Sequence, residues 1–276
     1  MIKTSIIIRT YNEVKYLGEC LEQIYKQTIK DFEIIIVDSE STDSTLEIAS
    51  KYPVKIIEIK KEDFSHGRSL NIGCRAAKGE YLVLISAHAI PVEKTWLEEL
   101  IKPFDENVAA VFGQQKPMKD AYPLVKRFVE NSWENIGKSR ILLSNSNSAI
   151  KKEIWEKLPF DEDLIAAEDV LWAKEVKTLG FEIVYNAKAA VYHSHNDTIA
   201  QVYKRYYQDM YGFIITKNQP IYIIIYLKDA FFNLIIDIKY LLQHKEKPKW
   251  FFIAFAHFMV KVAACLKCLF ILIKRK

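Results

Sequence analysis

The stretch that most restricts how this chain can fold is GEYLVLISAHAIP, residues 79–91. Residues 81–85 form a continuous apolar run without alternation, which is typical of a strand buried on both faces of a sheet. A run this short could also belong to a buried helix, but the flanking glycine and proline favour a strand. The chain then turns polar through Ser86 and His88. Because ligands bind outside the carboxyl ends of strands in open α/β sheets, we expect both residues to face an active site.

Strand-like runs recur along the chain, and helical patterns separate most of them. Strands that alternate with helices of about ten to fifteen residues indicate βαβ units and a parallel sheet with right-handed connections. The sequence therefore predicts an α/β fold with a mostly parallel central sheet. The expected strands cover residues 5–8, 32–37, 54–59, 81–85, 108–113, 144–150, 181–185 and 189–193.

Charge and cysteine content argue against a nucleic-acid binder and against a disulfide-rich secreted protein. The 276 residues include 39 basic and 35 acidic side chains, mixed along most of the chain, so we expect no nucleic-acid partner. Cys265 and Cys268 form a CxxC inside an apolar helical pattern, where we expect buried or membrane-facing thiols. The chain opens directly into a strand-like run without a signal peptide, which predicts a first domain in the cytoplasm.

The composition shifts after residue 199, and two long apolar stretches follow. Residues 221–242 are long enough to cross a bilayer, but a polar stripe interrupts them. Asp229, Asn233 and Asp237 form this stripe, because residues four apart lie on one helix face. Such a stripe argues against a helix surrounded by lipid.

Residues 250–273 are again apolar, and a basic tail, KRK, follows them. Lys and Arg side chains at the edge of an aromatic-rich amphipathic helix can extend toward anionic lipid head groups. We therefore expect residues 214–276 to form a helical region that docks peripherally on a membrane surface. A soluble helical cap or dimer face, and a true membrane span, are the alternatives.

Polar residues follow three of the predicted strands at their carboxyl ends, which are neighbours in a doubly wound sheet. Carboxylates there can accept hydrogen bonds from a pyrimidine N3–H or a ribose hydroxyl, an aromatic ring can stack on a base, and Arg68 is a candidate for the phosphates. Neither GxGxxG nor GxxxxGK[ST] occurs, which argues against a dinucleotide-binding or P-loop site. The polar residues are Thr10, Tyr11 and Glu13, then Asp38 and Ser39, then Ser86 and His88.

Several segments, taken in order, resemble the inverting family 2 glycosyltransferases, and most of all the rhamnosyltransferase-like members. They are SIIIRTYNE (5–13), IIIVDSESTDST (34–45), FSHGRSLNIG (64–73), the strand that begins GEY (79–81), AEDVLWAKEVKTLG (167–180) and VYHSHN (191–196). The resemblance covers roughly residues 2–213. It implies a GT-A fold, with a nucleotide-sugar half at residues 1–105 and an acceptor half at residues 106–213. It also implies transfer of a sugar from a nucleotide-diphosphate donor with inversion at the anomeric carbon.

The same resemblance implies a set of residues that contact a UDP-, dTDP- or GDP-linked sugar. Asp38 would recognise the base, and Arg68 and Asn71 would lie in a loop on the donor side. The full set is Thr10, Tyr11, Glu13, Asp38, Arg68, Asn71 and Ser86.

The family usually carries Asp-x-Asp, or a single Asp, where this chain has Ser86-Ala87-His88. His is a good ligand for Mn²⁺, whereas Mg²⁺ prefers oxygen. We expect a divalent metal, Mn²⁺ or Mg²⁺, at His88 and His195, and His193 is a further candidate partner. Two alternatives stay open. His88 contacts the diphosphate without a metal, or the donor site is degenerate and the chain is a non-catalytic nucleotide-sugar or glycan binder.

Glu168-Asp169 matches the family's acidic pair at the start of a helix. An inverting transfer needs one carboxylate to take the proton of the acceptor hydroxyl as its oxygen attacks C1. The resemblance implies that Asp169 is this base and that Glu168 orients the substrate, although the order could be reversed. The alternative is that both carboxylates only favour the helix N-terminus electrostatically.

The resemblance further implies an enzyme at the cytoplasmic face of the cell membrane. There it would act on a glycan or lipid-linked acceptor in bacterial surface polysaccharide assembly. A nucleotidyltransferase has a related α/β core and is another alternative. Such an enzyme would need a Gly-rich, basic phosphate loop near its N-terminus, which Arg9-Thr10-Tyr11 does not supply.

Overall fold

The computed structural model describes residues 3–134, 143–164, 166–211 and 220–274. The chain forms two compact units. The first comprises Met1–Lys116, Ser132–Asp163 and Glu168–His193, and the second comprises Pro117–Asn131, Leu164–Ala167 and Ser194–Lys276.

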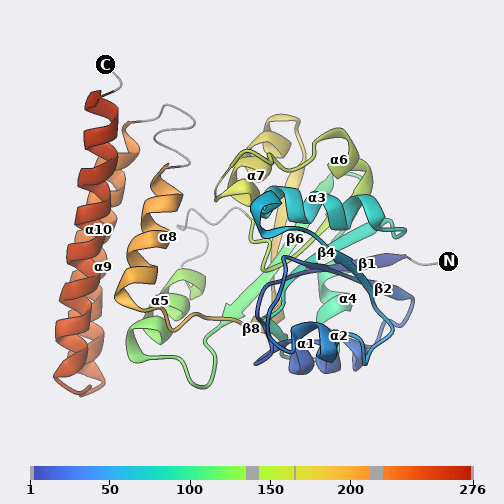
Figure 1. Ribbon diagram of the computed structural model, residues 1–276, viewed down its shortest axis with the longest axis horizontal. Helices are drawn as coiled ribbons and strands as arrows, with labels where there is room; N and C mark the ends of the chain where they lie inside the picture. The colour runs from blue at the N-terminus through green and yellow to red at the C-terminus, as the bar shows by residue number, and fades with distance from the viewer. Residues whose placement is uncertain (1–2, 135–142, 165, 212–219, 275–276) are drawn as a thin grey trace. The chain divides into compact units, whose positions relative to one another are not determined.

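An eight-stranded sheet forms the centre of the first unit (Figure 1). Its order is β3-β2-β1-β4-β7-β6-β8-β5. The pairs β1–β2, β1–β4, β2–β3 and β6–β8 are parallel, whereas β7 runs antiparallel to both neighbours and β5 runs antiparallel to β8. The predicted α/β fold with a mostly parallel sheet is confirmed. The strands are β1 (Thr4–Thr10), β2 (Phe32–Asp38), β3 (Lys55–Glu58), β4 (Tyr81–Ser86), β5 (Ile90–Pro91), β6 (Val108–Lys116), β7 (Asn147–Lys151) and β8 (Glu182–Tyr192).

The apolar run at residues 81–85 is the central strand β4, between β1 and β7. Its four residues from Leu82 to Ile85 are at most 2% exposed, as expected for a strand covered on both faces. The helices of the first unit that lie beside the sheet are α1 (Leu17–Tyr25), α2 (Thr45–Ala49), α3 (His66–Ala76), α4 (Trp96–Ile101), α6 (Lys152–Lys157) and α7 (Glu168–Thr178).

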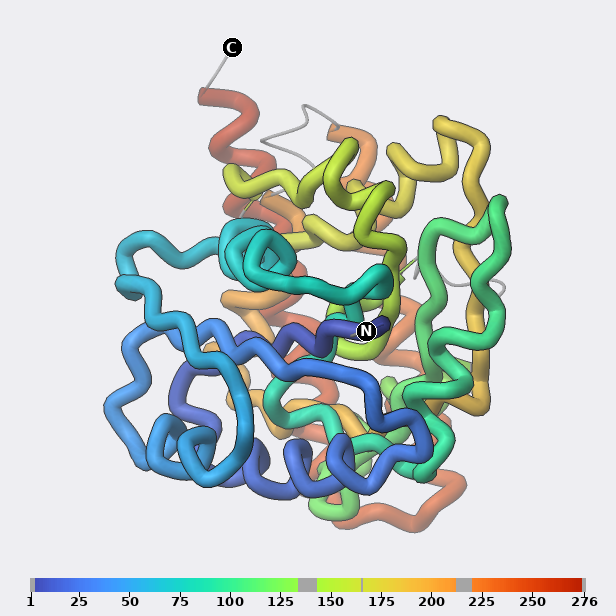
Figure 2. The backbone as a smooth tube through the Cα atoms, turned by 90° about the vertical axis from the view of Figure 1, so that its right-hand side faces the viewer, coloured from blue at the N-terminus to red at the C-terminus, as the bar shows by residue number. Residues whose placement is uncertain are grey.

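Helices α1 and α3 pack on opposite faces of β1 (Figures 1 and 2). Leu17 and Leu21 of α1 share a buried apolar cluster with Ile6, because residues four apart lie on one helix face. On the other face, Gly73 lets α3 approach the sheet closely, since a Cβ there would lie 2.5 Å from Ile7 Cγ2. Both contacts fix the helices that flank the carboxyl end of β1.

Two short strands were expected at residues 181–185 and 189–193, but the structure forms one strand, β8. Its pairing with β6 shifts register between Gly113 and Gln115. The extra residues of β8 form a bulge, and their polar sequence resembles a turn between two strands. A side chain at Gly113 would not fit beside the bulge, because its Cβ would lie 1.8 Å from the Ala189 carbonyl oxygen.

The second unit is helical and contains α8 (Ile199–Tyr211), α9 (Tyr222–Gln243) and α10 (Lys249–Lys274). Helix α5 (Pro123–Glu134) contributes residues to both units. The expected boundary at residue 213 therefore differs from the observed division, which assigns α8 to the second unit. The physical reason is a shared apolar cluster of Met210 with Ile223, Ala264, Cys265 and Cys268. The last two residues are buried free thiols, as predicted.

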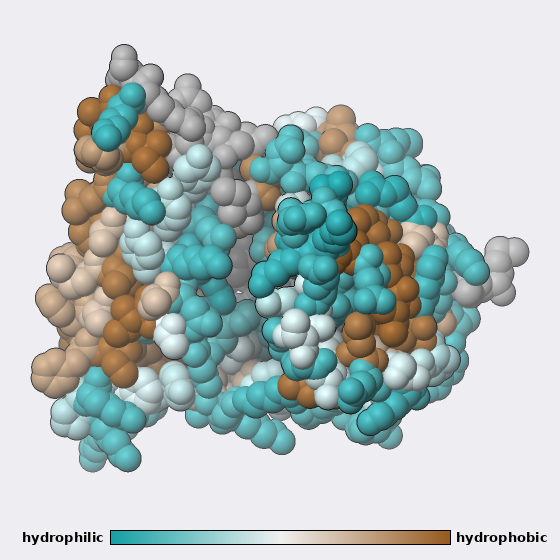
Figure 3. All heavy atoms as spheres, in the orientation of Figure 1, coloured by the Kyte–Doolittle hydropathy of each residue, from teal (hydrophilic) through white to brown (hydrophobic). Residues whose placement is uncertain are grey.

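The polar stripe predicted on residues 221–242 faces protein within the second unit. Arg127 of α5 donates to Asn233 Oδ1 at 2.9 Å and also to the Asp237 carboxylate. The polar face of α9 is thus paired inside the unit, while hydrophobic side chains gather along the outer surface of α9 and α10 (Figure 3).

Candidate active site

The carboxyl ends of β1, β2 and β4 lie side by side in the first unit. The strand register places Thr10 opposite Asp38, and Arg9 opposite Ser86. Three of the polar clusters singled out from the sequence therefore meet at one edge of the sheet. Ser86, the last residue of β4, is partly exposed there.

Asp38 is fully buried, and both of its carboxylate oxygens are engaged. Oδ1 accepts hydrogen bonds from Thr10 Oγ1 at 2.7 Å and from Ser41 Oγ at 2.6 Å. Oδ2 accepts from the Ser41 N–H at 2.8 Å. Asp38 therefore folds the loop after β2, and its predicted contact with a base stays a prediction.

The loops after β1 and β2 are joined by hydrogen bonds. Asn12 Oδ1 accepts from the Thr42 N–H at 2.8 Å, and the Asn12 N–H donates to Ser41 Oγ at 2.9 Å. Asn12 and Glu40 have φ angles of 55° and 58°, in a region that side chains other than glycine seldom adopt. These two residues with positive φ angles, together with the hydrogen bonds between the two loops, fix the backbone at this edge of the sheet.

Tyr11 presents a ring at this edge and is 40% exposed. Its hydroxyl accepts a hydrogen bond from Lys61 Nζ at 2.7 Å, and the ammonium lies 4.5 Å from the ring centroid. The pair combines an aromatic surface with a positive charge. Sequence reasoning missed Lys61, which lies in the charged run KKED and belongs to no recognisable motif.

His88 and His193 meet directly. The two Nε2 atoms lie 3.1 Å apart, and the rings are stacked at 16° with their centroids 4.8 Å apart. His88 Nδ1 lies 2.7 Å from Glu13 Oε1, and His193 Nδ1 lies 2.9 Å from Gln115 Oε1. Because both oxygens are acceptors, each Nδ1 is placed to donate to its oxygen, and the two Nε2 atoms lie within hydrogen-bonding distance of each other.

Gln115 also contacts Ser144, because its Nε2 donates to Ser144 Oγ at 2.9 Å. Glu13, expected in the donor loop, therefore orients His88. His195 lies two residues beyond His193, in the second unit, and its role as a metal ligand stays a prediction.

The acidic pair Glu168-Asp169 opens α7, as the sequence indicated. Glu168 is buried, and its Oε1 accepts from Asn145 Nδ2 at 3.2 Å and lies 3.7 Å from Arg9 Nη1. Asp169 is partly exposed, and its Oδ2 accepts from the Asn145 N–H at 3.2 Å while its Oδ1 accepts from the Val170 N–H at 2.8 Å. The two carboxylates thus have different environments.

Burial raises the pKa of Asp169 to about 7, and the neighbouring Glu168 charge adds to the rise. The two backbone N–H donors and Arg9 oppose it. A carboxyl group with such a pKa exchanges a proton near neutral pH, which suits a general base.

Two residues expected to bind the donor contact other protein groups in the structure, and their binding to the donor stays a prediction. Asn71 is buried on α3, where its Nδ2 donates to the Phe160 carbonyl at 2.8 Å and its Oδ1 accepts from Trp155 Nε1 at 2.9 Å. This side chain fixes the segment after α6, because its amide group is already fully used. Arg68 lies on α3 rather than in a loop, is exposed, and pairs with Asp63 at 3.5 Å.

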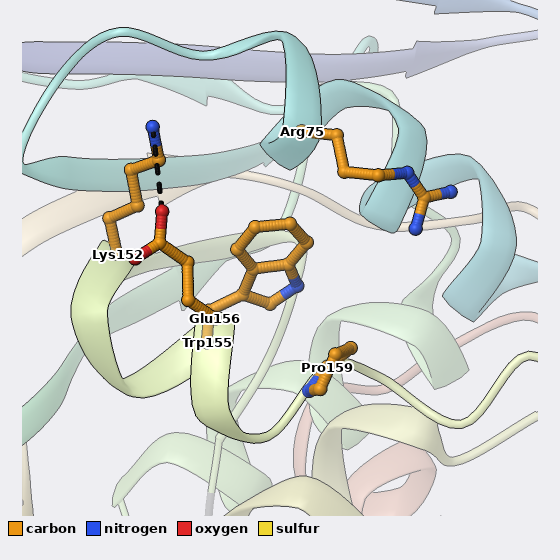
Figure 4. Close-up of a pocket in the computed structure, with 5 residues that line it drawn as sticks. All are labelled: Arg75, Lys152, Trp155, Glu156 and Pro159. Carbon is orange, nitrogen blue, oxygen red and sulfur yellow. Dashed lines mark ion pairs between the residues drawn. The ribbon is translucent and has the colours of Figure 1, made fainter.

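A surface pocket of about 360 Å³ lies elsewhere in the first unit (Figure 4). Arg75, Lys152, Trp155, Glu156 and Pro159 line it. The Lys152 N–H donates to the Glu80 carbonyl at 2.9 Å, which places the pocket beside the start of β4. It is therefore at the opposite end of that strand from Ser86 and is separate from the carboxylate and imidazole groups.

Sequence reasoning also missed Arg9 and Gln115 and gave Asn145 only a weak role. Arg9 stands inside the SIIIRTYNE segment, so its place in that segment was an available signal. Gln115 and Asn145 lie in segments without a motif, and only the pairing of β6, β7 and β8 brings them to the histidines and carboxylates.

Known proteins resemble this chain in sequence and in structure. A family model described as "Glycosyl transferase family 2" matches residues 5–156. The O-antigen chain rhamnosyltransferase WbaN of Salmonella anatum is 36% identical over 219 residues, which cover 74% of this chain and 70% of the relative. The O-antigen chain rhamnosyltransferase RfbN of Salmonella typhimurium is 32% identical over 222 residues, with coverage of 75% and 71%.

Among solved structures, the mannosyltransferase PcManGT from Pyrobaculum calidifontis, in complex with GDP-Man and Mn²⁺, has a TM-score of 0.62. It is 20% identical, and the match covers 97% of this chain and 74% of that chain. At this identity the likeness establishes a shared fold.

Proposed function

This chain belongs to glycosyl transferase family 2, and we propose that it transfers a sugar from a nucleoside-diphosphate donor to a hydroxyl group of a glycan or lipid-linked acceptor, with inversion at the anomeric carbon. It is a glycosyltransferase with a GT-A fold. Surface polysaccharide assembly is the proposed setting, because two relatives of high coverage are described as O-antigen chain rhamnosyltransferases.

The proposal rests on the difference between the environments of Glu168 and Asp169. Asp169 is partly exposed and has a pKa raised to about 7, mainly by burial, so it can accept a proton from an acceptor hydroxyl near neutral pH. As that proton leaves, the hydroxyl oxygen attacks C1 of the donor and the diphosphate departs from the opposite face. Glu168, buried and held by Asn145, orients the start of α7.

The residues present fit a divalent metal at His88 and His193. Their two Nε2 atoms face each other at 3.1 Å, close enough for one cation or one proton to lie between them. Imidazole ligands whose other nitrogen donates to an oxygen are typical of metal sites, and Glu13 and Gln115 provide those oxygens. When bound, a divalent cation supplies positive charge for the diphosphate leaving group. The ligand chemistry favours Mn²⁺ over Mg²⁺.

The placement of His195 two residues after His193 supports it as a further ligand, on sequence spacing alone. For the donor, the exposed ring of Tyr11 would stack on the base, and the Lys61 ammonium would face the phosphates. Rhamnose is the first sugar to test, because WbaN and RfbN are described as rhamnosyltransferases. UDP-, dTDP- and GDP-linked forms are all candidates.

We infer a peripheral position at the cytoplasmic face of the membrane from the surface of α9 and α10. Among the described residues, α10 alone is long and apolar enough to cross a membrane by length and composition, and 17% of its most apolar stretch is buried. Phe252, Leu266 and Ile273 are each at least 58% exposed. Residues 220–274 carry eight lysines against three acidic side chains, which suits an anionic lipid surface.

A donor panel tests the function. UDP-, dTDP- and GDP-sugars, including dTDP-rhamnose, are added with and without Mn²⁺, and the melting temperature is recorded because a ligand of the native state raises it. The stabilising donor is then assayed for nucleoside-diphosphate release with a glycan or lipid-linked acceptor, and the anomeric configuration of the product is determined. Binding without transfer or hydrolysis would indicate a non-catalytic binder. Release of pyrophosphate from a nucleoside triphosphate would indicate a nucleotidyltransferase.

A further inference from the structure

Arg9 is a largely buried cation next to the proposed base. It lies in β1 one residue before Thr10, and its side chain is 17% exposed. Nη1 lies 2.7 Å from His66 Nδ1, 3.4 Å from the His66 carbonyl oxygen and 3.7 Å from Glu168 Oε1. One guanidinium therefore links the end of β1 to the first residues of α3 and α7.

The chemistry of these contacts defines which groups are charged. A guanidinium stays protonated in proteins, so Arg9 donates to His66 Nδ1 and that nitrogen acts as the acceptor. The carboxylate of Glu168 is 5% exposed and receives the Arg9 charge together with a hydrogen bond from Asn145 Nδ2. A buried carboxylate without such partners is costly. Arg9 is thus the cation that compensates Glu168.

We propose that Arg9 is a positioning residue that holds Glu168 as the fixed anionic neighbour of Asp169, so that the proton of the acceptor hydroxyl goes to Asp169. This inference rests on the proposed function. In the step, the acceptor O–H bond breaks and its oxygen bonds to the anomeric carbon. The bond from that carbon to the diphosphate breaks, and the proton ends on the Asp169 carboxylate. Without Arg9, two adjacent carboxylates compete for one proton.

Among the described residues, the charged groups that act on Asp169 are Glu168 and Arg9, and the backbone N–H groups of Asn145 and Val170 donate to it. Arg9 favours the ionised form of Asp169, whereas Glu168 opposes it. Removal of the guanidinium should therefore move the titration of the base to higher pH, because a cation that stabilises the anionic form is lost.

The pH profile of kcat/KM tests this role. Arg9→Met removes the charge at similar length, and Arg9→Lys keeps it. Arg75→Met is the matched control, because Arg75 is an exposed arginine of α3 that pairs with Glu162 at 3.5 Å. We expect Arg9→Met to lose roughly 10²-fold in kcat/KM near neutral pH, with the midpoint of the acidic limb higher by about one pH unit. Arg9→Lys should retain most activity, and Arg75→Met should match the unsubstituted enzyme.

A double-mutant cycle with Glu168→Gln distinguishes a positioning role of Arg9 from a general loss of activity or stability. If Arg9 acts through Glu168, Arg9→Met should cost much less activity in the Glu168→Gln background. The melting temperature provides a readout that needs no turnover. At pH 8, Arg9→Met should lower it by about 2–8 °C, and clearly less when Glu168 is already Gln.

The outcomes distinguish the two proposals. If Arg9→Met and Glu168→Gln have coupled effects on the melting temperature but the chain transfers no sugar, the proposed function is rejected and the Arg9–Glu168 pairing is retained. The opposite outcome is sugar transfer in which Arg9→Met does not move the pH midpoint of kcat/KM, and in which its effects add to those of Glu168→Gln in both activity and melting temperature. That outcome would overturn the role of Arg9 and retain the proposed function.

Discussion

The Nε2 atoms of His88 and His193 lie 3.1 Å apart, and the Nδ1 atom of each ring lies against an oxygen on its other side. Glu13 fixes one ring and Gln115 fixes the other. Two Nε2 atoms at this distance can hold one proton or one cation between them, because an unprotonated Nε2 offers a lone pair. His88 stands where the family usually carries an Asp, so we propose that imidazole replaces carboxylate as the ligand.

Removal of either imidazole should abolish the response to Mn²⁺. We expect Mn²⁺ to raise the melting temperature and the affinity for nucleoside diphosphate, and His88→Ala or His193→Ala to weaken metal binding by at least roughly tenfold. His88→Asp should shift the preference toward Mg²⁺, because carboxylate oxygen suits the harder ion. Titration calorimetry measures both effects. His244→Ala, which removes an exposed histidine at the C-cap of α9, is the control, and an unchanged Mn²⁺ response in His88→Ala would contradict the site.

Asp169→Asn should remove the base while preserving shape. General-base catalysis contributes about 10²- to 10⁴-fold, so kcat should fall by that factor while donor affinity stays the same. In the unsubstituted enzyme, kcat/KM should rise with pH and level off above about 7, because the base works only when ionised and burial raises its pKa to about 7. Asp163→Asn, at an exposed carboxylate of the same unit, should change neither quantity. Full turnover by Asp169→Asn would show that Asp169 is not the general base.

Lys61→Ala should weaken donor binding without affecting the general base, Asp169. The ammonium contacts the hydroxyl and the ring of Tyr11, at the edge where we place the nucleotide. An exposed cation of this kind is worth about 1 kcal/mol, so we expect roughly a three- to tenfold rise in donor Kd. Lys60→Ala is a close control, since Lys60 is exposed and pairs with Glu62 at 3.7 Å. Equal effects of the two substitutions would show that Lys61 acts only through net charge.

The sequence predicted the parts of the fold that depend on local pattern. The all-apolar run at residues 81–85 indicated the central strand, because it lies between a glycine and a proline and lacks the alternation of a half-exposed strand. The bulge in β8 was mistaken for a turn, since its polar residues look like a break and only pairing with β6 carries the strand through. The extent of β8 is therefore set by its pairing with β6, a strand distant in the sequence.

His88 and Asp169 could be proposed as site residues because each lies in a motif of the sequence, and their roles stay predictions. Asn71 was proposed from its place in a recognisable segment, whereas the structure shows its side chain bonded to Phe160 and Trp155, so its contact with the donor stays a prediction. Lys61, by contrast, meets a partner 50 positions away in the chain. Contacts of this kind are set by how helices and strands pack, which a single sequence does not display.

The exposed apolar side chains of α10 should anchor the chain to anionic membranes. Phe252 is 78% exposed and Leu266 is 58% exposed, and lysines flank them along the helix. Each buried apolar side chain contributes about 1.5–3 kcal/mol, so Phe252→Ser with Leu266→Ser should lower vesicle affinity by at least roughly tenfold. Flotation of the full chain with phosphatidylglycerol vesicles measures this, and added salt should weaken binding because the lysines act through charge. Leu179→Ser, at a residue of the first unit that is 62% exposed, is the control. A full-length chain that stays monomeric without detergent and ignores vesicles at low salt would show that these helices serve another purpose.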